Sequence, residues 1–221
     1  MRTAYFNLIG GASGNMLLGA LVDAGLSVAQ VEAELSKLGT GGYRLRAEAG
    51  VRGAIGGTLV TVDLDEEGQR RREWAEFGTV IEGSPLEPDV KSKALSVFTS
   101  LIEAEARAHR SPQHHEKPHE LGTVDTLVDV VGVVAGLRLL GVESVHSSAF
   151  PSGRGTITSG HGVLPVPAPA TLEIFAAAGA PVRTPGPTGP DGEAVTPTGA
   201  AIVTGIASFS PAEMTIERAG Y

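Results

Sequence analysis

Histidines and carboxylates are concentrated in one short part of the sequence. Four of the six histidines fall within eleven residues, and acidic residues follow them. Imidazole and carboxylate groups together suit nickel, zinc or non-haem iron. Because the chain has no cysteine, a transition metal would have to be bound through nitrogen and oxygen. The candidate metal ligands are His109, His114, His115, His119, Asp125 and Asp129. The alternative is a solvated loop whose histidines are incidental.

The apolar segment 120–140 is predicted to form a long helix that carries two acidic residues on one face. At about 100° per residue, Asp125, Asp129, Gly132 and Gly136 fall on one narrow stripe. A buried carboxylate is costly unless it is paired or bound to a metal, and glycines let a backbone or a ligand approach closely. The stripe therefore favours a binding site, and the alternative is a face turned to solvent.

Three predicted helix starts are suited to anions. They lie at residues 10–14 (GGASG), 165–169 (PVPAP) and 196–199 (TPTG). A helix N-terminus offers free N–H groups and the positive end of the helix dipole. The first turn lacks the lysine of a phosphate-binding P-loop and the spacing of a dinucleotide fingerprint, so each start is also compatible with an ordinary structural turn. The candidate ligand-binding residues here are Gly11, Ser13, Gly14, Asn15, Thr196 and Thr198.

Two further candidate residues, His161 and Arg154, are each flanked by glycine on both sides. His161 has little steric cover and is suited to act as a ligand or as an acid or base, although a histidine before glycine is also common in turns. Arg154 could clamp an anion through two hydrogen bonds, or be an ordinary surface arginine in a tight turn. His146 lies in a strand-like run and is predicted to be structural.

The pattern of elements predicts a mixed α/β fold, with a mixed sheet, flanking helices and loops rich in glycine and proline. A single domain is expected over residues 1–221, with a small antiparallel subdomain at 40–66. The charged stretch 65–76 is predicted to be a solvated loop. The predicted strands cover residues 3–9, 43–64 and 142–150, and the predicted helices cover 14–25, 28–38, 89–109 and 120–140, followed by two helices that begin at prolines.

Composition narrows the classes of function. The 221 residues are 42% hydrophobic and 19% charged, which is typical of a globular chain. A net charge of −8 and only 5% aromatic residues argue against a nucleic-acid groove. The N-terminus lacks the apolar run of a signal peptide, and no uninterrupted apolar stretch is long enough to span a membrane. We therefore expect a cytoplasmic protein that binds small ligands or metal ions.

Four segments in this order resemble one family over nearly the whole chain. They are YFNLIGGASGNMLLGALVDAG (5–25), HELGTVDTLVDVVG (119–132), SGRGTITSGHGVLPVPAPAT (152–171) and AVTPTGAA (194–201). The run AEARAH (104–109) also looks like the family's approach to its histidine-rich loop. This is the LarC family of nickel insertion proteins.

The resemblance implies a CTP-dependent insertase, a lyase of the metal chelatase type. It would place Ni(II) into pyridinium-3,5-bisthiocarboxylic acid mononucleotide, with Mg or Mn, to complete the nickel-pincer cofactor of lactate racemase. His114, His115 and His119 would then capture or pass nickel, while Glu120, Asp125 and Asp129 would hold the metal or orient these histidines. His161, Glu120 and Asp125 would be the catalytic residues, and Arg154 would face the ligand.

The sequence departs from the family pattern in three places. Asn7 and Asn15 stand where the family usually has Asp, so a cation bound there would be held more weakly. The histidine-rich loop is short. The chain stops near the point where the family's C-terminal, CTP-binding domain begins. It would then be one of two split subunits with that domain as partner, a fragment, or a divergent member with a different task, and a homo-oligomer is a further alternative. Two other functions stay open: a nickel carrier without catalysis, and a phospho-ligand enzyme unrelated to nickel.

Overall fold

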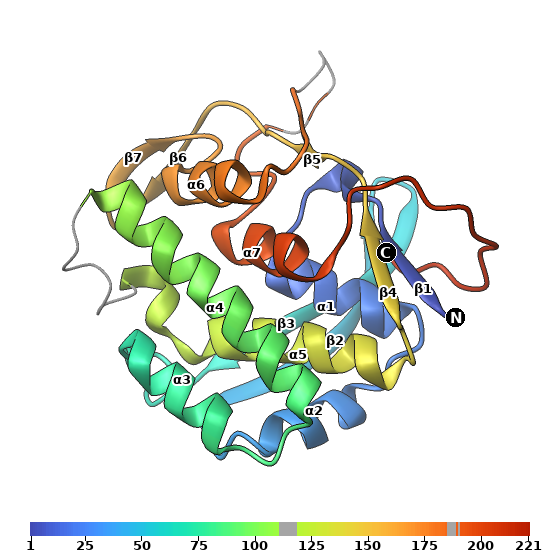
Figure 1. Cartoon of the computed structure of the whole chain (residues 1–221), viewed down its shortest axis with the longest axis horizontal. Helices are drawn as coiled ribbons and strands as arrows, with labels where there is room; N and C mark the ends of the chain where they lie inside the picture. Colours follow the sequence, from blue (N-terminus) through green and yellow to red (C-terminus); the bar gives the residue numbers. More distant parts are fainter. Residues whose placement is uncertain (111–118, 185–188, 190) are drawn as a thin grey trace.

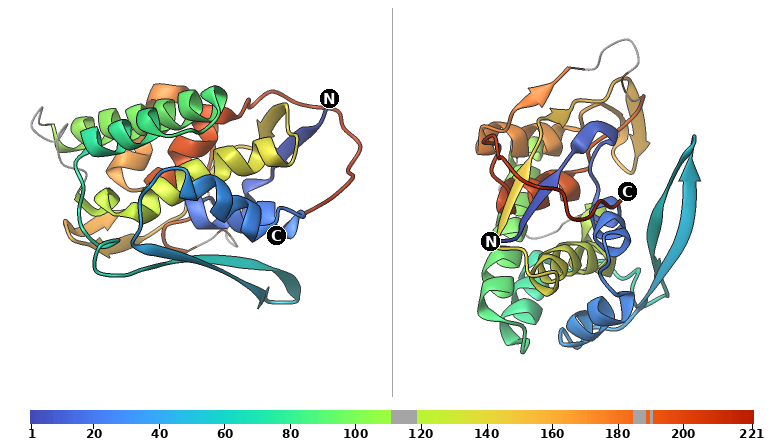
Figure 2. Two further views of the ribbon diagram at one scale, coloured as in Figure 1. Left: turned by 90° about the horizontal axis from the view of Figure 1, so that it is seen from below. Right: turned by 90° about the vertical axis from the view of Figure 1, so that its right-hand side faces the viewer.

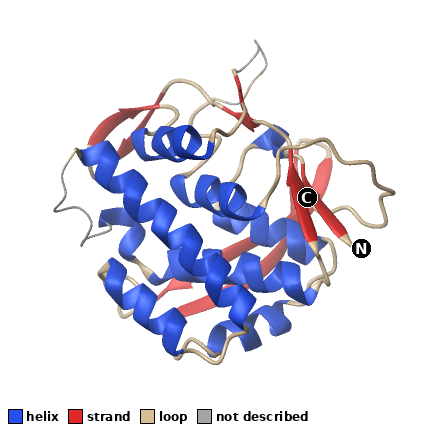
Figure 3. Ribbon diagram, in the orientation of Figure 1, coloured by secondary structure: helices blue, strands red, loops and turns tan. Residues whose placement is uncertain are grey.

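The computed structural model describes residues 1–110, 119–184, 189 and 191–221, and it confirms the mixed α/β class (Figures 1 and 3). The helices are α1 (Gly14–Asp23), α2 (Val28–Ser36), α3 (Trp74–Gly83), α4 (Pro88–His109), α5 (Val124–Leu139), α6 (Pro169–Ala178) and α7 (Pro197–Ile206). Two single turns of 3₁₀-helix, η1 (Leu8–Gly10) and η3 (His119–Gly122), precede α1 and α5.

Within the described ranges, the strands pair two by two rather than in one continuous sheet. β1 (Thr3–Phe6) and β4 (Ser144–Ser147) are parallel, as are β5 (Phe150–Pro151) and β8 (Val182–Arg183). β2 (Tyr43–Arg52) and β3 (Ile55–Leu64) form an antiparallel hairpin, and so do β6 (Thr156–Ser159) and β7 (Gly162–Pro165). The helices, not a central sheet, therefore hold the molecule together.

Helix α5 is the centre of the core. Its sequence, VDTLVDVVGVVAGLRL, is apolar on almost every side, which is typical of a helix buried all round. It contacts α1, α2, α4 and α7, and α4 in turn packs against α6 and α7 (Figure 1). Among the described residues, no helix combines the length and the apolar character that crossing a membrane requires.

The stripe predicted on α5 faces α1 and its neighbour α2. A Cβ atom added to Gly132 would lie 3.5 Å from the side chain of Leu18, and one added to Gly136 would lie 2.7 Å from the side chain of Leu26. The glycines thus let α1 and the loop after it approach α5 closely. The alternative of a face turned to solvent is wrong for this part of the stripe.

The hairpin β2–β3 lies along one side of the helices (Figure 2). Leu45 of β2 and Val60 of β3 are buried, and the hairpin contacts α1 through β3 and α2 through β2. The two strands predicted within residues 43–64 are therefore present, and their inner face is part of the common core.

The charged stretch after the hairpin differs from its prediction. It was expected to be a solvated loop through residue 76, but α3 begins at Trp74. Trp74 packs against Phe77 and Phe98, and Arg72 is only 5% exposed. Apolar packing of Trp74 and Phe77 outweighs the charged residues around them, so the prediction was wrong for residues 74–76, and α3 was not among the predicted helices.

Candidate metal and ligand site

Helices α1 and α7 begin side by side, although they come from opposite ends of the sequence. The N–H of Ala12 donates to the carbonyl of Ala194 at 2.9 Å, and the N–H of Thr196 donates to the carbonyl of Ala12 at 3.0 Å. These bonds pair the two entering segments as a short parallel bridge between Ala12 and Val195. The two helix N-termini therefore lie next to each other.

Side-chain caps fix both helix starts where the sequence predicts them. Thr196 accepts a hydrogen bond from the N–H of Gly199 at 3.1 Å, and Pro197 occupies the first position of α7. Ser13 accepts from the N–H of Met16 at 3.4 Å at the start of α1. A Cβ atom on Gly199 would lie 2.3 Å from the carbonyl oxygen of Ala12, so the close approach of the two segments requires glycine. The third predicted start is also present, because α6 begins at Pro169.

The other predicted ligand-binding residues lie around this junction. Gly11 has a φ of 112° and accommodates the close passage of Ala194. The side chain of Asn15 accepts a hydrogen bond from the hydroxyl of Ser13 at 2.5 Å. Thr198, in the first turn of α7, is buried. The glycine turn thus supports the packing of α1 against α7, as well as offering a helix N-terminus.

Arg154 already has an acidic partner. Its Nε donates to the carboxylate of Asp191, and this hydrogen bond holds the pKa of Asp191 below its usual value. Both side chains are exposed. Arg154 would therefore have to leave Asp191, or share it, in order to bind an anionic ligand.

The carboxyl group of Asp129 lies against the start of α1. A Cβ atom on Gly14 would lie 2.2 Å from Oδ2 of Asp129. Its other oxygen, Oδ1, is buried and has no hydrogen-bond partner among the described residues. Burial, with a smaller contribution from the charge of Asp125, raises the pKa of Asp129 from 3.8 to about 8. Asp129 is therefore suited to hold a proton near neutral pH, or to bind a cation that replaces it.

Asp125 lies one turn earlier on α5 and is partly exposed. It accepts a hydrogen bond from the hydroxyl of Thr123, the N-cap residue of α5. A carboxylate in the first turn of a helix interacts favourably with the helix dipole. Asp125 and Asp129 thus form an acidic pair beside the start of α1.

A second group of polar side chains lies where the end of α4 meets the β6–β7 turn (Figure 1). The ring centroids of His109 and His161 are 5.0 Å apart, and the two planes are inclined by 52°. On α4, Nε2 of His109 lies 3.5 Å from Oε2 of Glu105. Two imidazoles from distant parts of the sequence are thereby placed together beside a buried carboxyl group.

Two more carboxyl groups adjoin these histidines. Oε1 of Glu120 accepts a hydrogen bond from the N–H of Gly160, the residue before His161. Burial raises the pKa of Glu105, the charge of His161 opposes this rise, and the charge of Glu120 adds to it. Burial and the charge of Glu120 also raise the pKa of Glu193. We call Glu105, His109, Glu120, His161 and Glu193 the histidine–carboxylate cluster.

The structure therefore divides the predicted site residues into two groups. His109, His161 and Glu120 belong to the histidine–carboxylate cluster, whereas Asp129 lies against the start of α1 and Asp125 lies one turn before Asp129 on α5. His119 lies in η3, and His114 and His115 lie outside the described residues. In the part of the chain that is described, no three His, Cys, Asp or Glu side chains converge closely enough to hold a metal ion by themselves.

Sequence reasoning missed Glu105 and Glu193. The sequence could have indicated Glu105, because it lies four residues before His109 on a predicted helix and therefore on the same face. No sequence pattern could have indicated Glu193, because its approach to Glu120 depends on the pairing of two distant segments. His146 lies in β4, in line with the predicted strand, and its Nδ1 lies 3.2 Å from the carbonyl oxygen of Ser210.

Comparison with known proteins agrees with the motifs. Residues 4–221 match the family model described as nickel insertion protein. A relative from Thermomicrobium roseum is 47% identical over 100% of this chain and 54% of its own length. A relative from Desulfitobacterium hafniense, named pyridinium-3,5-bisthiocarboxylic acid mononucleotide nickel insertion protein, is 41% identical over 100% of this chain and 54% of its own length. No solved structure matches the chain.

The chain spans about half the length of these relatives. The match to the family model nevertheless covers nearly all of its residues, from the first strand to the last residue. It includes both helix starts and both groups of polar side chains described above. The chain belongs to the nickel insertion protein family, known as the LarC family.

Proposed function

We propose that this chain takes part in inserting Ni(II) into pyridinium-3,5-bisthiocarboxylic acid mononucleotide. The observation that carries the proposal is the pairing of His109 with His161 beside Glu105, in a member of a nickel insertion family. Imidazole is a preferred ligand of Ni(II), and neighbouring carboxylates orient imidazoles and increase their basicity. The name of the Desulfitobacterium hafniense relative supports the choice of acceptor.

An incomplete set of protein ligands suits a metal that has to be handed on. Closed sets of four protein ligands are typical of structural metal sites, whereas sites that react keep a position open. His109 and His161 would hold nickel as an incomplete pair of ligands, Glu105 would orient His109, and Glu120 would fix the turn that carries His161. Since the chain has no cysteine, the sulfur ligands would come from the thiocarboxylates of the acceptor.

The adjacent starts of α1 and α7 would bind the phosphate of the mononucleotide. Their N–H groups and helix dipoles attract an anion. Asp129 supports this role if it is protonated, because a neutral acid does not repel phosphate and can donate a hydrogen bond to it. Arg154 would add a positive charge at the rim of this site after leaving Asp191.

The remaining features of the reaction extend the proposal to the whole protein. CTP with Mg or Mn would supply the driving force through a C-terminal half like the one that the relatives possess. The product would be the nickel-pincer cofactor of lactate racemase, made in the cytoplasm by an enzyme of the lyase class. A homo-oligomer of this chain is part of the same proposal.

Nickel incorporation tests the proposal directly. The purified chain would be mixed with the thiocarboxylated mononucleotide, Ni(II), CTP and Mg, with and without the C-terminal half of the Desulfitobacterium hafniense relative, and the product identified by mass spectrometry. We expect incorporation when both halves are present. Nickel binding without incorporation would instead support the carrier function. Binding of the mononucleotide without any nickel binding would support the phospho-ligand enzyme.

A further inference from the structure

The charged segment between β3 and α3 is tied to the stretch that joins η3 to α5. The N–H of Arg72 donates to the carbonyl of Gly122 at 2.8 Å, and the N–H of Val124 donates to the carbonyl of Gly68 at 3.2 Å. These two bonds lie on either side of Thr123, the N-cap residue of α5. Residues 68–72 therefore hold both the end of η3 and the start of α5.

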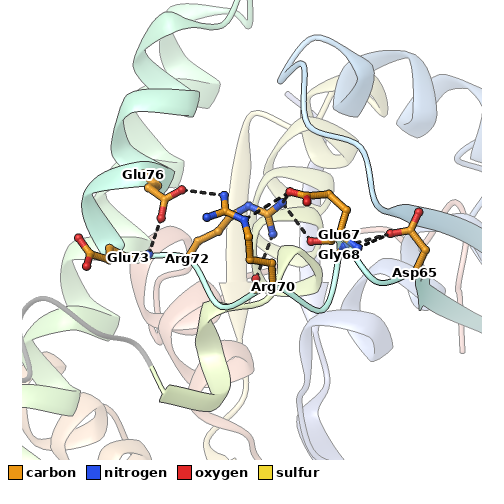
Figure 4. A network of polar contacts seen from close by, with 7 residues as sticks. All are labelled: Asp65, Glu67, Gly68, Arg70, Arg72, Glu73 and Glu76. Carbon is orange, nitrogen blue, oxygen red and sulfur yellow. Dashed lines mark hydrogen bonds and ion pairs between the residues drawn. The ribbon is translucent and has the colours of Figure 1, made fainter.

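The side chain of Arg72 stabilises the backbone conformation of this segment through hydrogen bonds to residues of the same segment. Its Nη1 donates to the carbonyl of Arg70 at 3.2 Å, and its Nη2 lies 3.4 Å from the carbonyl of Glu67 and 3.0 Å from Oε1 of Glu67 (Figure 4). Arg72 is only 5% exposed, and its guanidinium group is stable in this buried position because these oxygen atoms accept its hydrogen bonds. Removing the group would take this donor from the carbonyl of Arg70, whereas the carbonyl of Glu67 would keep the N–H of Arg70.

Other contacts keep the segment in place. Oδ1 of Asp65 accepts hydrogen bonds from the N–H groups of Glu67 and Gly68, at 2.9 and 3.0 Å. A Cβ atom on Gly68 would lie 1.9 Å from the carbonyl oxygen of Gly42, far closer than van der Waals contact, so the turn packs tightly against the start of the hairpin and requires glycine. Asp65 and Gly42 thus fix one end of the segment, and Arg72 fixes the other.

The stretch held in this way carries two acidic residues of the candidate site. Glu120 lies two residues before Gly122, and Asp125 follows Val124. Glu120 in turn accepts the hydrogen bond from Gly160 that fixes the turn carrying His161. A continuous series of contacts therefore leads from Arg72 through Gly122 and Glu120 to the β6–β7 turn.

We propose that Arg72 is a positioning residue that sets the place of Glu120, and through it of His161, in the histidine–carboxylate cluster. Its importance for nickel rests on the proposed function above. Arg70 is the matched comparison: it belongs to the same network, but it is half exposed, and its guanidinium group is paired, among the described residues, with the side chains of Glu67 and Glu76. A general loss of charge in this segment would affect both arginines alike, whereas positioning of Glu120 requires Arg72 alone.

The first test follows the hydrogen bond at Gly160 and needs no metal. The amide-proton chemical shift of Gly160 would be measured by NMR in the wild type, Arg72→Gln, Arg72→Lys and Arg70→Gln, at a temperature where each variant is folded. We expect the Gly160 signal to move upfield in Arg72→Gln and to stay in place in Arg70→Gln. Arg72→Lys keeps the charge but not the forked donors, and it should also shift the signal. An unchanged Gly160 signal in both Arg72 variants would overturn the proposal.

The second test measures Ni(II) affinity by calorimetry in the same proteins. Loss of a positioning contact is expected to weaken metal binding about 10- to 100-fold in Arg72→Gln, with little change in Arg70→Gln. Equal weakening in both variants would count against a specific role of Arg72. If the wild type bound no nickel, the proposed function would fail, and the Gly160 signal would still decide whether Arg72 positions Glu120.

Discussion

Gly14 and Asp129 are in direct contact, because α1 begins on the carboxyl group of α5. A Cβ atom at position 14 would lie 2.2 Å from Oδ2 of Asp129. We therefore expect Gly14→Ala to lower the free energy of unfolding by about 1–3 kcal/mol, as is typical of overpacking. Chemical denaturation would measure this. Gly10→Ala is the control, because a Cβ there meets nothing within 4 Å. Equal stability of the two variants would show that the contact is loose.

Asp129 should make the stability of the protein depend on pH. Its pKa is raised from 3.8 to about 8, so the folded state keeps a proton that the unfolded state releases. The contribution of this group to stability is therefore lost as pH rises between about 4 and 8, by at most about 1.4 kcal/mol per pH unit.

The variant Asp129→Asn isolates this effect. Its stability relative to the wild type should rise across that pH range and then level off, which urea denaturation at several pH values would show. If the difference between the two proteins stayed constant with pH, the carboxyl group would be ionised throughout.

The paired histidines should dominate nickel binding by the described part of the chain. We expect His109→Ala and His161→Ala each to weaken Ni(II) binding at least about tenfold, because each removes an imidazole from the cluster. Calorimetric titration would measure the affinity. His146→Ala is the matched control, since that ring contacts the carbonyl of Ser210 instead. A similar loss in all three variants would mean that the cluster is not the site.

Release of Arg154 from Asp191 should favour anion binding. If Arg154 contacts the phosphate of the mononucleotide, Asp191→Asn should tighten binding. The guanidinium group would then no longer have to break its ion pair with the Asp191 carboxylate before it binds the phosphate. Arg154→Ala should weaken binding. Fluorescence or calorimetric titration with the mononucleotide would compare them. Unchanged affinity in both variants would place the ligand away from Arg154.

Local signals explain what the sequence predicted well. The starts of α1, α6 and α7 were readable because caps and prolines act within one turn, and the stripe on α5 was readable because helical spacing is regular. The beginning of α3 was missed because the charges before Trp74 conceal the burial of its ring. The surroundings of His161 could not be read at all, since His109 and Glu120 reach it only through tertiary packing.

The bridge between Ala12 and Val195 has a consequence for the order of folding. The paired starts of α1 and α7 need backbone from Ala12 and from residues 194–196, so they cannot form before both segments have been synthesised. Closing so long a loop is slow and follows the assembly of local helices. This junction, the proposed anion site, should therefore form only after residues 194–199 have left the ribosome, and a nascent chain should not bind the proposed ligand before then.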